Sequence, residues 1–230
     1  MILFFAAVGG EPAEAGGIGG SLSFAAGSSR LEDTDDVWSD LDTETGAVGL
    51  GLVFDTNLAR DRLLNYRLAT SVEFLNEEVG QAGLENEVQG ARFNFDQTLG
   101  FGIVRTPDVR VFIGPSLHLG VGRVDDHIWV EGFRANYDRT SFTVGLGPEL
   151  GVNFNVGPNL TFSTSAYLRY GLQVQRFHDF YDEAGSDGVF AGDEIRAGLV
   201  TSIFFRFDDD QYAYAERDDR SRRGRWSRRD

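Results

Sequence analysis

The chain has 230 residues, no cysteine and a formal net charge of −15. The absence of cysteine excludes a disulfide framework and any thiolate metal site. The acidic balance argues against nucleic acid as a partner, and the length fits one large β domain as well as two small ones. No apolar run approaches the ~20 residues that a membrane helix needs.

The longest apolar run, ILFFAAV at residues 2–8, lies near the start of the chain. It precedes the triplet Ala13-Glu14-Ala15, which has the small-x-small form of a signal-peptidase site. A basic region before the run is missing. We therefore predict that residues 1–15 are a clipped signal peptide; the alternative is an apolar N-terminal segment packed on the domain.

Eight segments alternate between apolar and small or polar residues, which is the period of a β-strand. In the second of them, Val48, Leu50, Leu52 and Phe54 share one face, with glycines between them. The segments cover about 17–27, 46–55, 64–75, 90–104, 109–123, 140–155, 160–175 and 197–207.

The predicted connections alternate in length along the chain. Long ones run over 28–45, 76–89, 124–139 and 176–191, and short ones over 56–63, 105–108 and 156–159. In an up-and-down barrel this puts all four long loops at one end and both termini at the other, as in outer-membrane barrels. We predict an all-β fold, an eight-stranded antiparallel up-and-down transmembrane β-barrel over residues 16–207.

The residues on the opposite face indicate whether the apolar face meets lipid or a protein core. It is mostly Gly, Ala, Ser and Thr, which suits the narrow interior of an eight-stranded barrel rather than a wet exterior. Aromatic residues on the apolar face fall near both ends of the strands, as expected at two lipid interfaces. The apolar face is therefore predicted to meet lipid; the alternative is a soluble lipocalin-like binder with that face inward.

Two prolines lie inside predicted strands. Pro115 and Pro148 each remove a ladder hydrogen bond, and both occur in Gly-Pro-x-Leu sequences, GPSL and GPEL. We expect a β-bulge at each.

On these features the chain resembles the small eight-stranded outer-membrane barrels, the group of the OmpA transmembrane domain, OmpX and OmpW. The resemblance covers about residues 17–207 and includes the closing strand, where Phe205 and Phe207 match the aromatic positions of the signal that such proteins present to the barrel-assembly machinery. Ser202 stands where a Gly is usual, and a tail follows where many members end. The resemblance implies a bacterial outer-membrane location, with long loops outside and both termini periplasmic.

Charged residues fall on the face predicted to line the lumen. Buried charges are tolerated only when paired, so we expect a network of ion pairs that fills the barrel. Hairpin register places Asp96 near His118 and Glu149 close to Arg169. An alternative is a gate in which the pairs exchange to open a narrow pore. The expected network consists of Glu73, Arg92, Asp96, Arg110, His118, Glu149, Arg169 and Arg196.

Three of the lumen residues also raise the question of catalysis. Ser116, His118 and Asp96 have the residue types of a Ser-His-acid set, and some outer-membrane barrels modify lipids. Same-face neighbours of this kind are common by chance, so we do not expect an enzyme.

Two segments are strongly charged. Segment 28–45 carries weak candidate ligands for Ca²⁺ or Mg²⁺, but it lacks the spacing of an EF-hand loop, so a solvated acidic loop is expected and no metal or cofactor. Segment 208–230 turns from acidic to Arg-rich and is expected to be a disordered periplasmic tail. The candidate ligands are Asp33, Asp35, Asp36, Asp40 and Asp42.

The expected function is a structural or surface-interaction protein with a plugged lumen. The alternatives are a narrow pore or transporter of small apolar molecules, as the resemblance to OmpW implies, and less favoured a lipid-modifying enzyme. The expected partners are outer-membrane lipid and lipopolysaccharide, the barrel-assembly machinery, and a surface ligand bound through the long loops. We expect a monomer.

Overall fold

The computed structural model describes residues 16–34, 40–56, 58, 63–81, 84–106, 108–130, 133–157, 159–179 and 187–207. The side chains of 81, 84–86, 125–130, 133–138, 178–179 and 187 are not described. The predicted signal peptide, the C-terminal tail, Asp35 and Asp36 lie outside these residues. No helix among them is long and apolar enough to cross a membrane.

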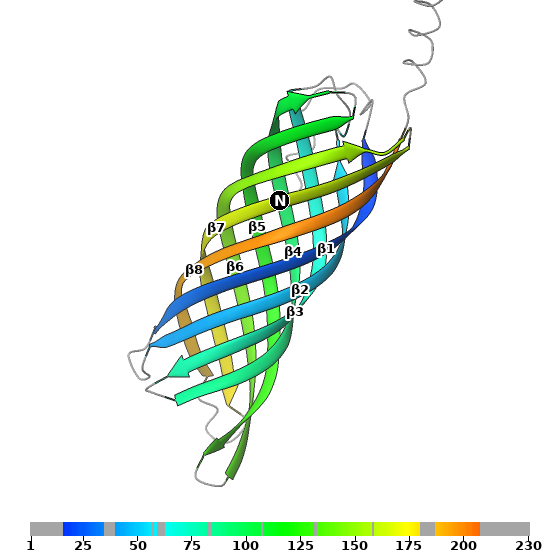
Figure 1. Cartoon of the computed structure of the whole chain (residues 1–230). Coiled ribbons are helices and arrows are strands. Elements are labelled where there is room, and N and C mark those ends of the chain that lie inside the picture. Colours follow the sequence, from blue (N-terminus) through cyan, green and yellow to red (C-terminus); the bar gives the residue numbers. More distant parts are fainter. Residues whose placement is uncertain are drawn as a thin grey trace, which may run out of the picture.

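Eight antiparallel strands form a closed barrel in which each strand pairs with its sequence neighbours (Figure 1). The ring closes between the first and last strands, from the pair Gly17↔Arg206 to the pair Asp33↔Phe190. The fold prediction is therefore confirmed. The strands are β1 (Gly17–Asp33), β2 (Leu41–Asp55), β3 (Leu64–Gln81), β4 (Leu84–Arg105), β5 (Val109–Val130), β6 (Phe133–Asn155), β7 (Leu160–Asp179) and β8 (Asp187–Arg206).

The outer surface of the barrel is an apolar band. Leu50, Leu172 and Phe205 are 62%, 62% and 65% exposed, whereas the glycines and charged residues of the alternate positions point inward. Exposing this much apolar surface to water would be costly, so the band suits hydrocarbon. The closed ring leaves no unpaired strand edge there.

The barrel has two unlike ends. At the terminal end lie Gly17, Arg206 and the connections after β2, β4 and β6. At the distal end β1, β3, β5 and β7 end, and there β5 and β6 reach furthest (Figure 1). The predicted strand ends agree with the structure at the terminal end but fall short at the distal end.

The long distal loops predicted at 28–45, 76–89, 124–139 and 176–191 are wrong, because most of these residues are strand. Residues 82–83 alone separate β3 from β4, and residues 131–132 alone separate β5 from β6. The error has a physical cause. Beyond the apolar band the strands continue with the opposite polarity, so that the outward residues become charged and the inward ones apolar.

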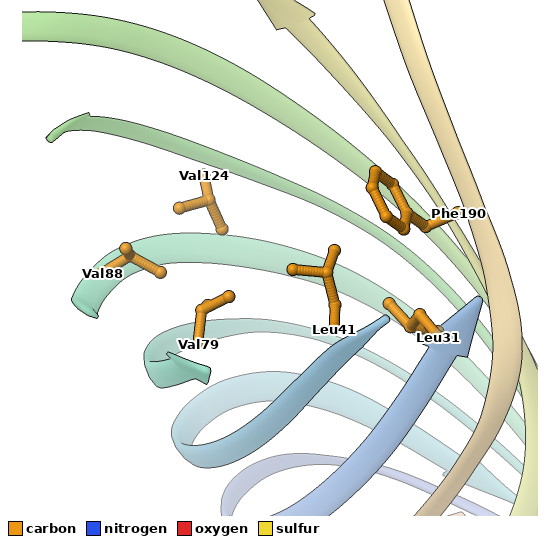
Figure 2. Close-up of a cluster of buried hydrophobic side chains, with 6 residues drawn as sticks. All are labelled: Leu31, Leu41, Val79, Val88, Val124 and Phe190. Atoms are coloured by element: carbon orange, nitrogen blue, oxygen red, sulfur yellow. The ribbon is translucent and has the colours of Figure 1, made fainter. Parts of the chain in front are cut away.

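This inversion is visible on single strands. On β3, Phe74 points outward within the band, whereas four residues later the outward residue is Glu78 and its neighbour Val79 points inward. On β5, Arg123 is exposed and Val124 is 2% exposed. Figure 2 shows the inward cluster that results, which we call the distal cluster: Leu31, Leu41, Val79, Val88, Val124 and Phe190.

The expected bulges at the two prolines are also wrong. Pro115 and Pro148 lie directly opposite each other in the β5–β6 ladder, and the register is the same on both sides of them. Proline has no backbone N–H to donate. In each strand this missing donor instead interrupts the ladder with the other neighbouring strand. Bridges are missing between Thr98↔Ser116 and Phe101↔Ile113 in β4–β5, and between Leu146↔Tyr170 and Glu149↔Tyr167 in β6–β7. The register shift that does occur in β4–β5 lies at Gly102/Val104.

Candidate functional site: the lumen

The lumen is filled by polar side chains from all parts of the ring. Of the predicted network, seven residues are at most 5% exposed, and the Asp96 side chain is 21% exposed. The structure brings them into three groups along the barrel axis: a distal group, a middle group and a terminal group. The seven are Glu73, Arg92, Arg110, His118, Glu149, Arg169 and Arg196.

The distal group is a chain of alternating acids and bases that crosses the lumen. Arg139 on β6 donates to Glu77 on β3. Arg92 on β4 donates to Glu194 on β8 at 3.1 Å, and Glu194 lies 3.8 Å from Arg196. Arg196 in turn donates to Glu73 on β3. Strands that are not neighbours in the ring are thus tied through the interior.

The middle group is centred on one carboxylate. Asp96 Oδ1 lies 2.7 Å from His118 Nδ1 and 2.7 Å from Arg169 Nη1, so the proximity of Asp96 and His118 predicted from the hairpin register is found. The Arg169 guanidinium also lies over the ring of Tyr167, 3.8 Å from its centroid. The Arg169 guanidinium is thus held in place by two contacts, one with a carboxylate and one with an aromatic face.

Glu149 joins the middle group through hydroxyls rather than through a direct ion pair. Arg169 Nη2 donates to Ser116 Oγ at 2.9 Å, and the hydroxyls of Ser116 and Thr98 are 3.1 Å apart. Thr98 donates to Glu149 Oε2 at 2.5 Å. In the ladder Glu149 lies opposite Tyr167, one inward position from Arg169. The two charges are therefore coupled through a short relay.

This geometry argues against a Ser-His-acid catalytic set. His118 Nε2 lies beside Gly120, within 3.1 Å of the position that a Cβ there would take, which is on the side away from Ser116. Ser116 itself is engaged by Arg169 and Thr98. A nucleophile needs its hydroxyl on the base, so the three residue types do not form that arrangement.

The terminal group surrounds Arg67, which is 4% exposed. Its Nε donates to Asp55 at 2.9 Å, and its Nη2 donates to Asn153 and Ser163 at 3.0 and 3.1 Å. Its guanidinium also lies 4.6 Å from the ring centroid of Phe112. The predicted network residue Arg110 is completely buried near this group.

Apolar side chains close the lumen at both ends. The distal cluster covers the outermost ion pairs, and Phe177 packs against it with its ring centroid 5.1 Å from that of Phe190. At the terminal end Leu58, from the β2–β3 connection, is completely buried against Val53 and Phe204. The polar interior is thus enclosed between two apolar layers.

Several residues of the network were missed by sequence reasoning. Each has the same parity along its strand as a predicted lumen residue: Glu77 follows Glu73 by four positions, and Glu194 precedes Arg196 by two. Extending the inward parity beyond the expected strand ends would have found Glu77, Arg139 and Glu194, whereas Asp55 and Arg67 lie on the inward face within the expected strands. The missed residues are Asp55, Arg67, Glu77, Arg139 and Glu194.

The acidic candidates for a metal site remain a hypothesis. Asp40 lies 3.1 Å from Arg30, and the part of the chain that the structure describes contains no group of three or more His, Asp or Glu side chains that could hold a metal ion. Asp33 is buried at the distal rim and Asp42 is exposed on β2. Phe205 and Phe207, the expected assembly signal, are exposed at the terminal end.

Comparisons with known proteins identify solved structures that share this architecture. No protein-family model and no curated protein matches the sequence. Among solved structures, the outer membrane protein OprG from Pseudomonas aeruginosa superposes with a TM-score of 0.64 at 12% identity, over 86% of this chain and 98% of that chain. A major outer membrane protein from Thermus thermophilus gives a TM-score of 0.49 at 13% identity, over 82% of this chain and 99% of that chain.

The outer membrane protease OmpT from Escherichia coli gives a TM-score of 0.39 at 8% identity, over 84% of this chain and 96% of that chain. The closed ring, the outward apolar band and the likeness to OprG agree with one another. The chain therefore has the fold of the small eight-stranded outer-membrane β-barrels that its sequence resembles.

Proposed function

We propose that the protein is a bacterial outer-membrane barrel with a structural or surface-interaction role, and that its lumen is a plug rather than a pore. The observation that carries this is the burial of paired charges across the lumen. Ion pairs join β3, β4, β6 and β8 across the interior, and apolar side chains close both ends.

Charge balance supports the same proposal. Among the described charged residues that are at most 5% exposed, with Asp96 added, six arginines face six carboxylates, so their formal charges cancel. A pore that selects ions carries an excess of one charge. The arginines are 67, 92, 110, 139, 169 and 196, and the carboxylates are 55, 73, 77, 96, 149 and 194.

The orientation that we propose puts the distal end outside the cell and the termini in the periplasm. The inverted distal walls would then stand above the lipopolysaccharide as a rigid platform, and a surface ligand would bind there rather than on long flexible loops. The aromatic residues at the terminal end would lie at the inner interface, where the assembly machinery would meet Phe205 and Phe207.

Bilayer conductance tests the plug. Refolded wild-type protein should insert without producing current. A triple variant, Arg92→Ala, Glu194→Ala and Arg196→Ala, should conduct because it removes the centre of the distal group. Its current also serves as the control, because it shows that inserted barrels are detected. Stable current steps from the wild type would contradict the proposal.

A second candidate is passage of small or apolar molecules, and the interrupted ladders beside Pro115 and Pro148 favour it. Missing hydrogen bonds weaken the wall on both sides of the β5–β6 pair, at mid-height of the apolar band. Movement of that pair would open a path between lumen and lipid.

A disulfide across the seam tests this candidate. Thr98 and Ser116 are ladder partners on β4 and β5 whose hydroxyls are 3.1 Å apart, and the chain has no cysteine of its own. If the wall opens, uptake of an apolar dye into the barrel in the Thr98→Cys, Ser116→Cys variant should stop on oxidation and return on reduction. Uptake that ignores the disulfide, or no uptake by the wild type, would rule the candidate out.

A further inference from the structure

Two groups of polar side chains interrupt the outward apolar band. On β3 and β4, Tyr66 Oη donates to Gln97 Oε1 at 2.8 Å. On β7 and β8, Thr164 and Thr201 face outward as ladder partners. We call these two groups the β3–β4 polar spot and the β7–β8 polar spot.

Gln97 has unused hydrogen-bonding capacity in a place without water. It lies eight residues from the exposed Gln89 and eight from the exposed Arg105, halfway along the apolar part of β4. Among the described residues, its Nε2 group has no hydrogen-bond partner. A donor that meets only hydrocarbon is costly, and the lipid headgroups lie about 15 Å away. The donor therefore indicates a protein partner at mid-depth.

The second polar spot lies at the same depth as Gln97. Ladder partners in a tilted sheet differ in depth, but the tilt cancels when the ladder is followed both ways around the ring. From Gln97, four steps through β3, β2 and β1 reach Phe205 on β8. Four steps through β5, β6 and β7 reach Ile195 on β8. The position on β8 at the depth of Gln97 is halfway between them, at residue 200, and Thr201 is next to it.

The two polar spots also lie on opposite sides of the barrel. In the ring of eight strands, β8 is four strands from β4 in either direction, and β7 is four strands from β3. Copies of one protein inserted in the same orientation keep these depths. A sideways shift of one copy therefore puts its Thr201 against Gln97 of another.

Charges beyond the apolar band match in the same way. Glu87 lies ten residues distal of Gln97 on β4, and Arg176 lies twelve residues distal of Thr164 on β7. Both side chains are exposed. They are thus at nearly the same depth on opposite sides of the barrel, so the sideways shift that joins the polar spots also brings a carboxylate to a guanidinium.

We propose that the barrels associate side by side in rows, with the β3–β4 polar spot of one copy on the β7–β8 polar spot of the next. Gln97 Nε2 donates to the Thr201 or Thr164 hydroxyl of the neighbour, and Glu87 pairs with the neighbour's Arg176. Hydrogen bonds between polar side chains hold membrane segments together in this way. Because the two contact faces are opposite, the contact does not close and gives a row.

The charges also decide against a symmetric dimer through Gln97. In such a dimer the β3–β4 faces of two copies would meet. Glu78 and Glu87 are exposed ladder partners on these strands, so four carboxylates would gather at the contact. The row brings only one β3–β4 face to each contact.

Cysteine cross-linking of the full chain in intact outer membranes tests the row. Leu99 and Ile203 are exposed, and each lies two residues nearer the terminal end than Gln97 and Thr201 respectively. They are on opposite sides of one barrel, so a disulfide between them has to join two copies. Oxidation of the Leu99→Cys, Ile203→Cys variant with iodine, which enters hydrocarbon, should give a ladder of dimers, trimers and larger species on a non-reducing gel.

Leu52→Cys, Leu150→Cys is the matched control. These exposed residues are on β2 and β6, also four strands apart. The ladder followed both ways from Leu52 reaches Phe154 and Val144, so residue 149 on β6 has the depth of Leu52. This control reports random collision and should give no ladder. Leu99→Cys alone should remain monomeric.

Two further variants test the contacts in the Leu99→Cys, Ile203→Cys background. Gln97→Leu should lower the yield of cross-linked species about threefold through the loss of one hydrogen bond in the membrane. Glu87→Arg should lower the yield because it puts an arginine against Arg176 of the neighbour. Adding Arg176→Glu to Glu87→Arg should restore the yield. The boiling-dependent gel shift of each variant shows that the barrel is folded.

An equal ladder in the control pair, or no ladder in the test pair, would overturn the proposal. Dimers from Leu99→Cys alone would overturn it in favour of a symmetric contact. The row rests on the membrane location that we propose and not on the plug, so the failures are distinguishable. A protein that fractionates as soluble rejects the location, and a conducting barrel that still forms the ladder rejects the plug alone.

Discussion

At the scale of single residues, the stability of the lumen depends on charges that have no access to water. Arg67 is the clearest case, because its guanidinium contacts Asp55, Asn153 and Ser163 and lies against two aromatic rings. Asp55 is completely buried. Removing one partner of such a pair leaves an uncompensated charge in a low-dielectric interior.

We therefore expect Arg67→Met to lower the free energy of unfolding by about 3–5 kcal/mol. The measurement is urea unfolding of the refolded barrel, followed by tryptophan fluorescence. Arg30→Met is the matched control, since the Arg30–Asp40 pair is exposed to solvent and exposed pairs contribute little. Equal losses in the two variants would mean that the terminal group does not hold the barrel together.

At the scale of elements, each strand has two parts with opposite polarity. The outward side chains change from apolar to charged between Phe74 and Glu78 on β3, and between Val121 and Arg123 on β5. This change marks the limit of the lipid. The strands then continue as a water-facing wall around the distal cluster, which stabilises the extension in the way that a core stabilises a soluble barrel.

Single cysteines can locate that limit, because the chain has none of its own. In intact membranes a charged maleimide should label Glu78→Cys and Arg123→Cys, since both positions lie in water. It should not label Phe74→Cys or Val121→Cys until the membrane is dissolved and the protein unfolded. Labelling of all four in the intact membrane would place the apolar band outside the lipid.

The same change of polarity limited what the sequence could predict. Period-two alternation identified all eight strands and their terminal ends, because there one face stays apolar. It failed near Val79, Val88 and Val124, where the apolar residues move to the other face and the pattern resembles a loop. The same alternation predicted that the side chains of Glu73, Arg92 and Arg196 point into the barrel.

The sequence predicted which residues point into the lumen better than it predicted which of them contact one another. Asp96 and His118 face each other across one hairpin, so their contact follows from local register. Arg139 and Glu77 are 62 residues apart on strands that are not neighbours, and only the curvature of the closed ring brings them together. The choice of Thr98 rather than Arg169 as the direct partner of Glu149 likewise depends on side-chain reach across the interior.

At the scale of the whole molecule, the protein is a closed barrel whose apolar face points outward. The most direct measurement is the gel mobility of the membrane fraction with and without boiling. We predict that the protein stays with the outer membrane in the absence of detergent and that the unboiled form migrates differently from the boiled one, because a closed barrel resists dodecyl sulfate until it is heated. A protein that fractionates as soluble and migrates identically in both lanes would contradict the account and turn the apolar face inward.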